Sequence, residues 1–224
     1  MPRRYRSKTY SIGDIEIRLQ TPRDLGQYTD SDRAFPLFGI VWDSAQVLSE
    51  LMLDYHMAGE IRGKRILEIG CGMALVSHLL NTLDADITAL DIHPVTAGFL
   101  SRNAALNNCK PISFVNASWS DKLPDLGDFD LILGSDVLYE PRHIETLAPF
   151  LNLHARSRSE VVIVDPDRGQ LEDFRKEMSE YGFTCESNRP TFLDRSTASF
   201  EGVVDRFTRQ PSAGIECRTY VTDN

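Results

Sequence analysis

The sequence has little of what marks a secreted, membrane-spanning or nucleic-acid-binding protein. Its four cysteines are scattered over 224 residues, without a CxxC pair or neighbouring histidines, which argues against a zinc site and a disulfide framework. No apolar run approaches the roughly 20 residues that a membrane span requires. Lysine and arginine total 24 against 33 aspartates and glutamates, and the net charge of −9 disfavours binding to a phosphate backbone. We expect free thiols, no bound metal, a cytoplasmic location, and neither membrane nor nucleic acid as a partner.

What the sequence has instead is a regular alternation of short apolar runs and longer helical patterns. Apolar runs of strand length occur at 65–69, 86–90, 112–115, 129–133 and 161–164, and helical spacing of apolar residues separates them. This alternation is typical of a parallel sheet wrapped by helices. The sequence therefore predicts a doubly wound α/β fold.

The two ends of the chain depart from this alternation. Residues 15–19 alternate apolar and charged side chains, which predicts a β extension, a strand or hairpin, within residues 1–40. Near the other end, residues 203–204 and the alternating residues 215–221 predict closing antiparallel strands. The chain is long enough for one domain with a sizeable core, so we expect a single domain whose core spans 41–224.

A glycine turn stands where the first of these strands gives way to a helix. Gly70 and Gly72 let the backbone approach a ligand that a Cβ would exclude, although glycine also serves tight packing of a helix on a strand. Asp91 ends the next strand, where a carboxylate can accept hydrogen bonds from both hydroxyls of a ribose. The alternative role for Asp91 is a helix cap before His93. Together the turn and the carboxylate favour a nucleoside-containing ligand.

The residues around the turn distinguish a sulfonium nucleoside from a dinucleotide. The dinucleotide pattern G-x-G-x-x-G is broken at Leu75, and the acidic Glu68 precedes the turn, where it would sit badly beside a diphosphate. An ammonium group suits Glu68 better. S-adenosylmethionine carries an ammonium group and a ribose but no phosphate. We therefore expect S-adenosylmethionine as the cofactor.

With these features the sequence resembles the class I S-adenosylmethionine-dependent methyltransferases. Their first motif is an acidic residue followed by x-G-x-G-x-G, and Ala74 stands here in place of the third glycine. Three further segments, W-D-S-A at 42–45, A-S-W at 117–119 and D-V-L-Y at 136–139, resemble the seven-β-strand protein lysine methyltransferases of the methyltransferase-16 type. The resemblance implies a Rossmann-like sheet of seven mostly parallel strands with helices on both faces, and methyl transfer to a protein lysine.

The resemblance also assigns roles by position. Trp42 and Trp119 become walls of the cofactor pocket, where an indole packs on an adenine or near a sulfonium, although tryptophans are more often core residues. Asp136 and Tyr139 face the methyl-accepting amine; their alternative roles are a cap for the next helix and a packing residue beneath it. The full set expected at the cofactor is Trp42, Glu68, Gly70, Cys71, Gly72, Asp91, Ile92, Ser118, Trp119 and Ser135.

Two other polar features have simpler interpretations. Asp165-Pro166-Asp167 follows the fifth strand on the same sheet edge and could shape the acceptor cleft, but a plain turn explains it as well. His78 lies on an apolar helix face, where we expect a structural histidine with satisfied ring nitrogens rather than a catalytic one.

Three functions stay open at this point. They are a protein lysine methyltransferase, a methyltransferase for a small molecule or nucleic acid, and a catalytically silent protein that binds S-adenosylmethionine. The acidic balance and the lack of an N-P-P-Y-like segment count against a nucleic-acid acceptor. The segment at 136–139 favours catalysis over silent binding. A protein that presents a lysine is the partner we expect.

Overall fold

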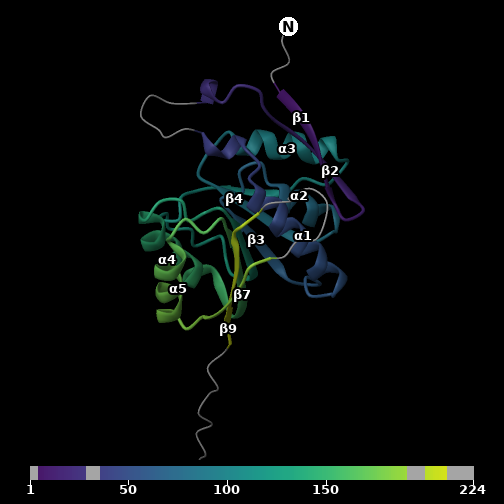
Figure 1. Ribbon diagram of the computed structural model, residues 1–224. Coiled ribbons are helices and arrows are strands. Elements are labelled where there is room, and N and C mark those ends of the chain that lie inside the picture. The colour runs from purple at the N-terminus through teal and green to yellow at the C-terminus, as the bar shows by residue number, and fades with distance from the viewer. Residues whose placement is uncertain (1–4, 29–35, 191–199, 211–224) are drawn as a thin grey trace, which may run out of the picture.

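Seven strands form one mixed sheet within the residues that the computed structural model describes, 5–28, 36–190 and 200–210. The strand order is β5-β4-β3-β6-β7-β9-β8 (Figure 1). The first five strands in this order are parallel, and β9 is antiparallel to both of its neighbours. The bounds are β3 Arg65–Ile69, β4 Asp86–Asp91, β5 Ser113–Asn116, β6 Phe129–Ser135, β7 Ala155–Asp165, β8 Thr184–Asn188 and β9 Val203–Arg209. The predicted doubly wound sheet is confirmed.

Helices cover both faces of this sheet. Three helices lie on one face and two on the other (Figure 1). Neighbouring strand residues point to opposite faces, so Ile66 and Leu131 join the first core while Leu67 and Ile132 join the second. The two sets are α1 Asp43–Met57, α2 Leu75–Thr82 and α3 Thr96–Leu106, then α4 Arg142–His154 and α5 Leu171–Glu180. Burial on both faces explains the nearly continuous apolar runs of these strands.

The N-terminal extension is an antiparallel hairpin of β1 (Tyr5–Ile12) and β2 (Ile15–Pro22), as the alternation predicted. Its buried side chains, Leu19 among them, join the core that α1, α2 and α3 cover. Asn103 of α3 and Asn107, the residue that follows this helix, each bond both the N–H and the carbonyl of one β2 residue, at 2.8 to 3.2 Å. The hairpin is thus attached to α3 by apolar packing and by side-chain amides.

The C-terminal part of the sheet differs from the prediction. β9 covers the predicted residues 203–204, but it pairs with β7 and β8, and residues 215–221 lie outside the described residues. Every residue of β8 is exposed, so the strand has no apolar alternation to reveal it. β7 begins at Ala155, well before the predicted residues 161–164. The sequence did not reveal this first part of the strand because residues 156–158 are exposed and polar.

The connections bring several loops to one edge of the sheet. Two short 3-10 helices, η1 (Gly26–Tyr28) and η2 (Leu37–Gly39), lie between the hairpin and α1. The strand order reverses beside β3, because β4 and β5 are added on one side of it and β6 and β7 on the other, so the carboxyl ends of β4 and β6 flank that of β3. Open sheets bind ligands at this kind of crevice. None of the described helices is long and apolar enough to cross a membrane.

Candidate active site

A cavity of about 880 Å³ opens at the carboxyl ends of the parallel strands. Its size is typical of small-molecule sites, and its position is the one expected for an open α/β sheet. All of the predicted site residues except Glu68 line it: Trp42, Gly70, Cys71, Gly72, Asp91, Ile92, Ser118, Trp119, Ser135, Asp136 and Tyr139. Segments far apart in the sequence therefore meet around one space.

The turn after β3 forms the floor of one end of this cavity. Gly70 and Gly72 have φ values of +57° and +51°, the left-handed region in which a side chain is strained. A Cβ on Gly72 would lie 3.0 Å from the carbonyl oxygen of Phe38, and one on Gly70 would lie 3.0 Å from Val137. The turn therefore packs between two other cavity walls, and the two glycine positions leave little room for a side chain. Ala74, in the position of the usual third glycine, is also left-handed, with φ of +56°.

Asp91 stands beside the turn and is held by two backbone N–H groups. Its Oδ2 accepts a hydrogen bond from Gly72 N at 2.8 Å, and its Oδ1 accepts one from His93 N at 2.7 Å. Only 6% of Asp91 is exposed, and this burial raises the pKa of its carboxyl group. Both carboxylate oxygens are fixed in orientation, and each keeps a lone pair for a ligand hydroxyl.

Glu68 is the predicted residue that the structure keeps out of the cavity wall. Alternation along β3 turns its side chain under α2, where its carboxylate accepts hydrogen bonds from the N–H and hydroxyl groups of Ser77. Ala74, which precedes α2, makes no side-chain cap, so Glu68 satisfies an otherwise free N–H of the first turn. Complete burial raises the pKa of Glu68 to about 7. In this structure Glu68 supports the turn from behind.

Aromatic and apolar side chains enclose the space above the turn. Trp42 and Trp119 are half-buried and line the cavity, so neither is a plain core residue. Phe38 stacks on the ring of His93 with centroids 4.0 Å apart. Ile92 is 64% exposed although it also lines the cavity, which places an apolar side chain at the rim. These walls suit a flat, partly apolar ligand.

Asp136 lies at the end of β6, with the left-handed φ of +56° and a side chain only 6% exposed. Its two carboxylate oxygens bind the guanidinium of Arg168 through a two-bond ion pair, whose Nη2–Oδ2 distance is 3.0 Å. The alternative role as a helix cap is wrong, because α4 starts after Pro141 without a side-chain cap. Sequence reasoning missed Arg168, since nothing in the local pattern of residues 165–168 reveals a partner 32 residues earlier.

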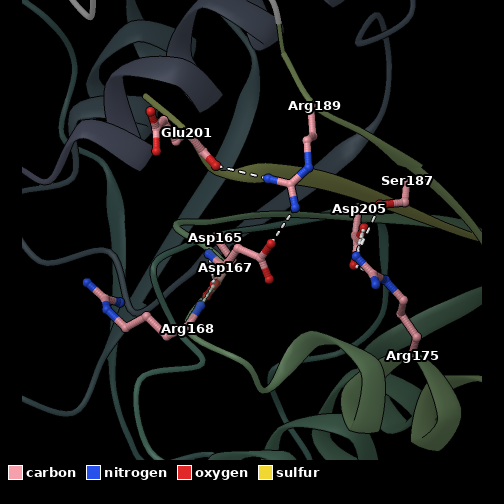
Figure 2. Close-up of polar contacts among 8 residues, drawn as sticks. All are labelled: Asp165, Asp167, Arg168, Arg175, Ser187, Arg189, Glu201 and Asp205. Atoms are coloured by element: carbon pink, nitrogen blue, oxygen red, sulfur yellow. Dashed lines mark hydrogen bonds and ion pairs between the residues drawn. The ribbon is translucent and has the colours of Figure 1, made fainter. Parts of the chain in front are cut away.

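The loop after β7 presents Arg168 to the cavity. Asp165 accepts hydrogen bonds from the N–H groups of Asp167 and Arg168, at 2.7 and 3.4 Å. Arg189 in turn donates to the Asp167 carboxylate at 2.5 Å and to the Glu201 carbonyl at 3.0 Å. Figure 2 shows the Arg168 side chain extending away from this network. The segment is therefore more than a plain turn, although Asp165 and Asp167 do not themselves line the cavity.

Tyr139 and His143 form the aromatic part of the same end of the cavity. Tyr139 is 41% exposed, so it does not simply pack beneath α4 as its alternative role required. Its ring meets that of His143 edge to face, with centroids 4.4 Å apart, and His143 meets Trp119 edge to face at 5.2 Å. Burial raises the pKa of Tyr139, which keeps its hydroxyl protonated. His143 lines the cavity and was also missed from the sequence, where its helical setting gives no sign of a ligand.

Comparison with solved structures shows the fold. The 16S rRNA N2 G1207 methyltransferase of T. thermophilus matches 93% of this chain and 52% of its own, with a TM-score of 0.69 at 14% identity. The magnesium protoporphyrin IX methyltransferase of Synechocystis matches 82% of this chain and 88% of its own, with a TM-score of 0.57 at 18% identity. At these identities the likeness shows the fold alone, which this chain shares with both methyltransferases.

Comparison of sequences then gives the family. Residues 30–181 match the family described as lysine methyltransferase, so this chain belongs to the lysine methyltransferase family. The zebrafish (Danio rerio) protein N-lysine methyltransferase METTL21A is 29% identical over 70% of this chain and 76% of its own length. The Xenopus laevis histone-arginine methyltransferase METTL23 is 33% identical over 48% of this chain, and the match spans about half of that relative, 47%. The predicted resemblance is confirmed, and S-adenosylmethionine is the methyl donor of this class.

Proposed function

We propose that this chain transfers a methyl group from S-adenosylmethionine to the side-chain amine of a lysine in a protein substrate. The observation that carries the proposal is the continuity of one cavity, which runs from the glycine turn and Asp91 to Asp136 and Tyr139. A donor site and an acceptor site must adjoin for a methyl group to pass directly between them. METTL21A, described as a protein N-lysine methyltransferase, supports lysine as the acceptor.

The donor end fits S-adenosylmethionine. Asp91 keeps two fixed oxygens for the ribose hydroxyls, and the turn at 70–72 has no side chain that would exclude the methionine part. Trp42, Trp119 and Ile92 provide flat or apolar walls for the adenine and the region of the sulfonium. Cys71, Ser118 and Ser135 complete the proposed contacts. Glu68 acts on the ligand through the position of the turn, because its own oxygens are bonded to Ser77.

The acceptor end supplies orientation. Bound S-adenosylmethionine provides an electrophilic methyl group, and the transfer is an in-line displacement that needs little covalent help from the protein. Asp136 is held rigidly by Arg168 at the end of β6, and Tyr139 adds a hydroxyl and a ring that is partly open to solvent. These groups border the space in which an amine must sit to reach the donor. We also propose a cytoplasmic location, on the scattered cysteines of the sequence.

Arginine is the second candidate acceptor, and two observations favour it. Asp136 already receives a guanidinium group through two bonds, that of Arg168, so its carboxylate can bind this shape. METTL23, described as a histone-arginine methyltransferase, is a relative of this chain. Lysine leads because the match to METTL21A covers more of both chains.

A label-transfer assay tests the function. The purified protein is incubated with methyl-labelled S-adenosylmethionine and a cell lysate, after which proteins, nucleic acids and small molecules are separated. We expect the label in protein, and acid hydrolysis should release it as methyl-lysine. Recovery as methyl-arginine would select the second candidate, label in nucleic acid or small molecules would contradict both, and no transfer would indicate silent binding.

A further inference from the structure

His143 has one ring nitrogen fixed by the backbone. His143 is the second residue of α4, after Arg142. The Nδ1 atom of His143 lies 3.0 Å from the carbonyl oxygen of Val137. Because a carbonyl oxygen only accepts hydrogen bonds, Nδ1 must carry the proton, and the neutral ring then keeps a basic lone pair on Nε2. The rings of Tyr139 and Trp119 flank the imidazole and hold its orientation. His143 is therefore built to present one defined basic nitrogen within the cavity wall.

The neighbouring carboxylates are already occupied by cations of this chain. Asp136 is bound through both oxygens by Arg168. Glu140 Oε2 lies 2.5 Å from Nε of Arg142 and 4.0 Å from Nε2 of His143. A carboxylate held in an ion pair is a poorer proton acceptor than a free one. The acceptor end therefore offers Asp136 and Glu140 as orienting groups rather than as bases.

We propose that His143 is the general base that removes the proton from the acceptor amine, an inference that rests on the proposed lysine transfer. The ammonium group of the lysine gives one proton to Nε2. The neutral amine then forms the new N–C bond with its lone pair, while the methyl–sulfur bond breaks and its electrons stay on sulfur. The resulting imidazolium lies 4.0 Å from Glu140, which stabilises the charge until the proton passes to water.

The charges around the ring suit this role. Burial lowers the pKa of His143; the hydrogen bond to the Val137 carbonyl and the charge of Glu140 raise it, and Arg142 lowers it, with a net lowering that leaves the ring neutral at pH 7.5. Burial raises the pKa of Tyr139 and leaves it a phenol. Environments that shift the pKa values of two neighbouring groups in opposite directions in this way give one group the role of a base and the other that of a hydrogen-bond donor. Arg142 and Arg168 also line the cavity, each paired with a carboxylate of this chain.

Kinetics of the His143→Gln variant test the proposal, with the protein labelled by the wild-type enzyme as the acceptor. We expect kcat at pH 7.5 to fall by about 100-fold, within the range typical of general-base loss, while S-adenosylhomocysteine affinity in calorimetry is unchanged. We also expect a changed pH profile: kcat of the wild type is flat from pH 7 to 9, whereas the residual rate of the variant rises with pH. A variant rate within about twofold of wild type, or a lower rate with an unchanged profile, would overturn the role as base.

His154 provides the matched control. It lies on the same helix and also bonds a carbonyl through Nδ1, to Gly127 at 2.9 Å, but it does not line the cavity. His154→Gln should leave kcat and its pH profile unchanged. Nitrogen NMR of the wild type gives a test that needs no acceptor: at pH 7.5 we expect His143 protonated on Nδ1 alone. A proton on Nε2 would exclude the base, whereas a wild type that labels no protein would instead contradict the proposed function.

Discussion

The two ends of the cavity are built from different materials. At the donor end the backbone makes the site: two left-handed glycines form the turn, and two N–H groups orient Asp91. At the acceptor end side chains make it, through the pair of Asp136 with Arg168 and the rings of Tyr139 and His143. A site made by the backbone suits a ligand that stays the same, the methyl donor. A site made by side chains can be altered by single substitutions to fit another acceptor without disturbing the binding of the donor.

The largest effect should come from the donor end. Asp91→Ala removes the carboxylate that we place on the ribose, and loss of two charged hydrogen bonds should weaken S-adenosylhomocysteine binding by about 100-fold in calorimetry. Asp86→Ala changes the exposed residue at the other end of the same strand and should bind normally. An Asp91 variant with wild-type affinity would place the cofactor elsewhere.

At the acceptor end, the change should affect turnover and leave binding intact. Asp136→Asn keeps a residue that tolerates the left-handed backbone but loses the charge that holds Arg168, and we expect kcat/KM to fall by about 50-fold with unchanged cofactor affinity. The exposed α5 variant Asp173→Asn is the control. If Asp136→Asn lost cofactor affinity as well, the two ends would not be separable.

Glu68 distinguishes support of the donor end from direct contact with the donor. It lies behind the glycine turn, and we expect its substitution to change the pH dependence of the free energy of unfolding. Its pKa is about 7 in the folded protein against 4.5 as the reference, so only the folded form keeps the proton between these values. The stability from the neutral form is complete below pH 4.5 and is lost as the pH rises through about 7. Between pH 5 and 8 the free energy of unfolding measured in urea should fall by roughly 2 kcal/mol more for the wild type than for Glu68→Gln. Parallel losses in both proteins would show that the carboxylate stays ionised.

The smallest effect concerns the departure from the glycine motif. Ala74 is strained in the left-handed region at the start of α2, and Ala74→Gly should raise the free energy of unfolding by about 1 kcal/mol. Gly169 gives the reverse comparison, because its φ of +96° has no neighbour within reach of a Cβ and Gly169→Ala should destabilise through the backbone alone. An Ala74 variant less stable than wild type would mean that its buried methyl group outweighs the strain.

The sequence predicted the donor end better than the acceptor end for a physical reason. A strand, a glycine turn and a carboxylate one strand later are local patterns, so Gly70, Gly72 and Asp91 were identified correctly as neighbours of one cavity. Glu68 was placed at the cavity from its position alone, although strand alternation turns it under α2. Arg168 meets Asp136 only through the pairing of β6 with β7, which no short pattern records.

His78 shows the same limit in the core. It was expected to have satisfied ring nitrogens, but both are buried without a hydrogen-bond partner among the described residues, and burial lowers its pKa to about 4. The residues that share its predicted apolar face are buried, but so is nearly the whole of α2, from Leu75 to Asn81. Whether a partner reaches a buried nitrogen depends on tertiary contacts, and these leave no trace in the spacing.

Two asparagines at the C-terminal end of α3 have a consequence for solubility. An open strand edge is a template on which the strand of another molecule can add, and proteins protect such edges in several ways. Asn103 and Asn107 present a donor and an acceptor each, at the spacing of a helical turn, and so imitate a neighbouring strand along β2. The helix thereby closes that edge of the hairpin to intermolecular pairing, and this protection depends on two amide groups.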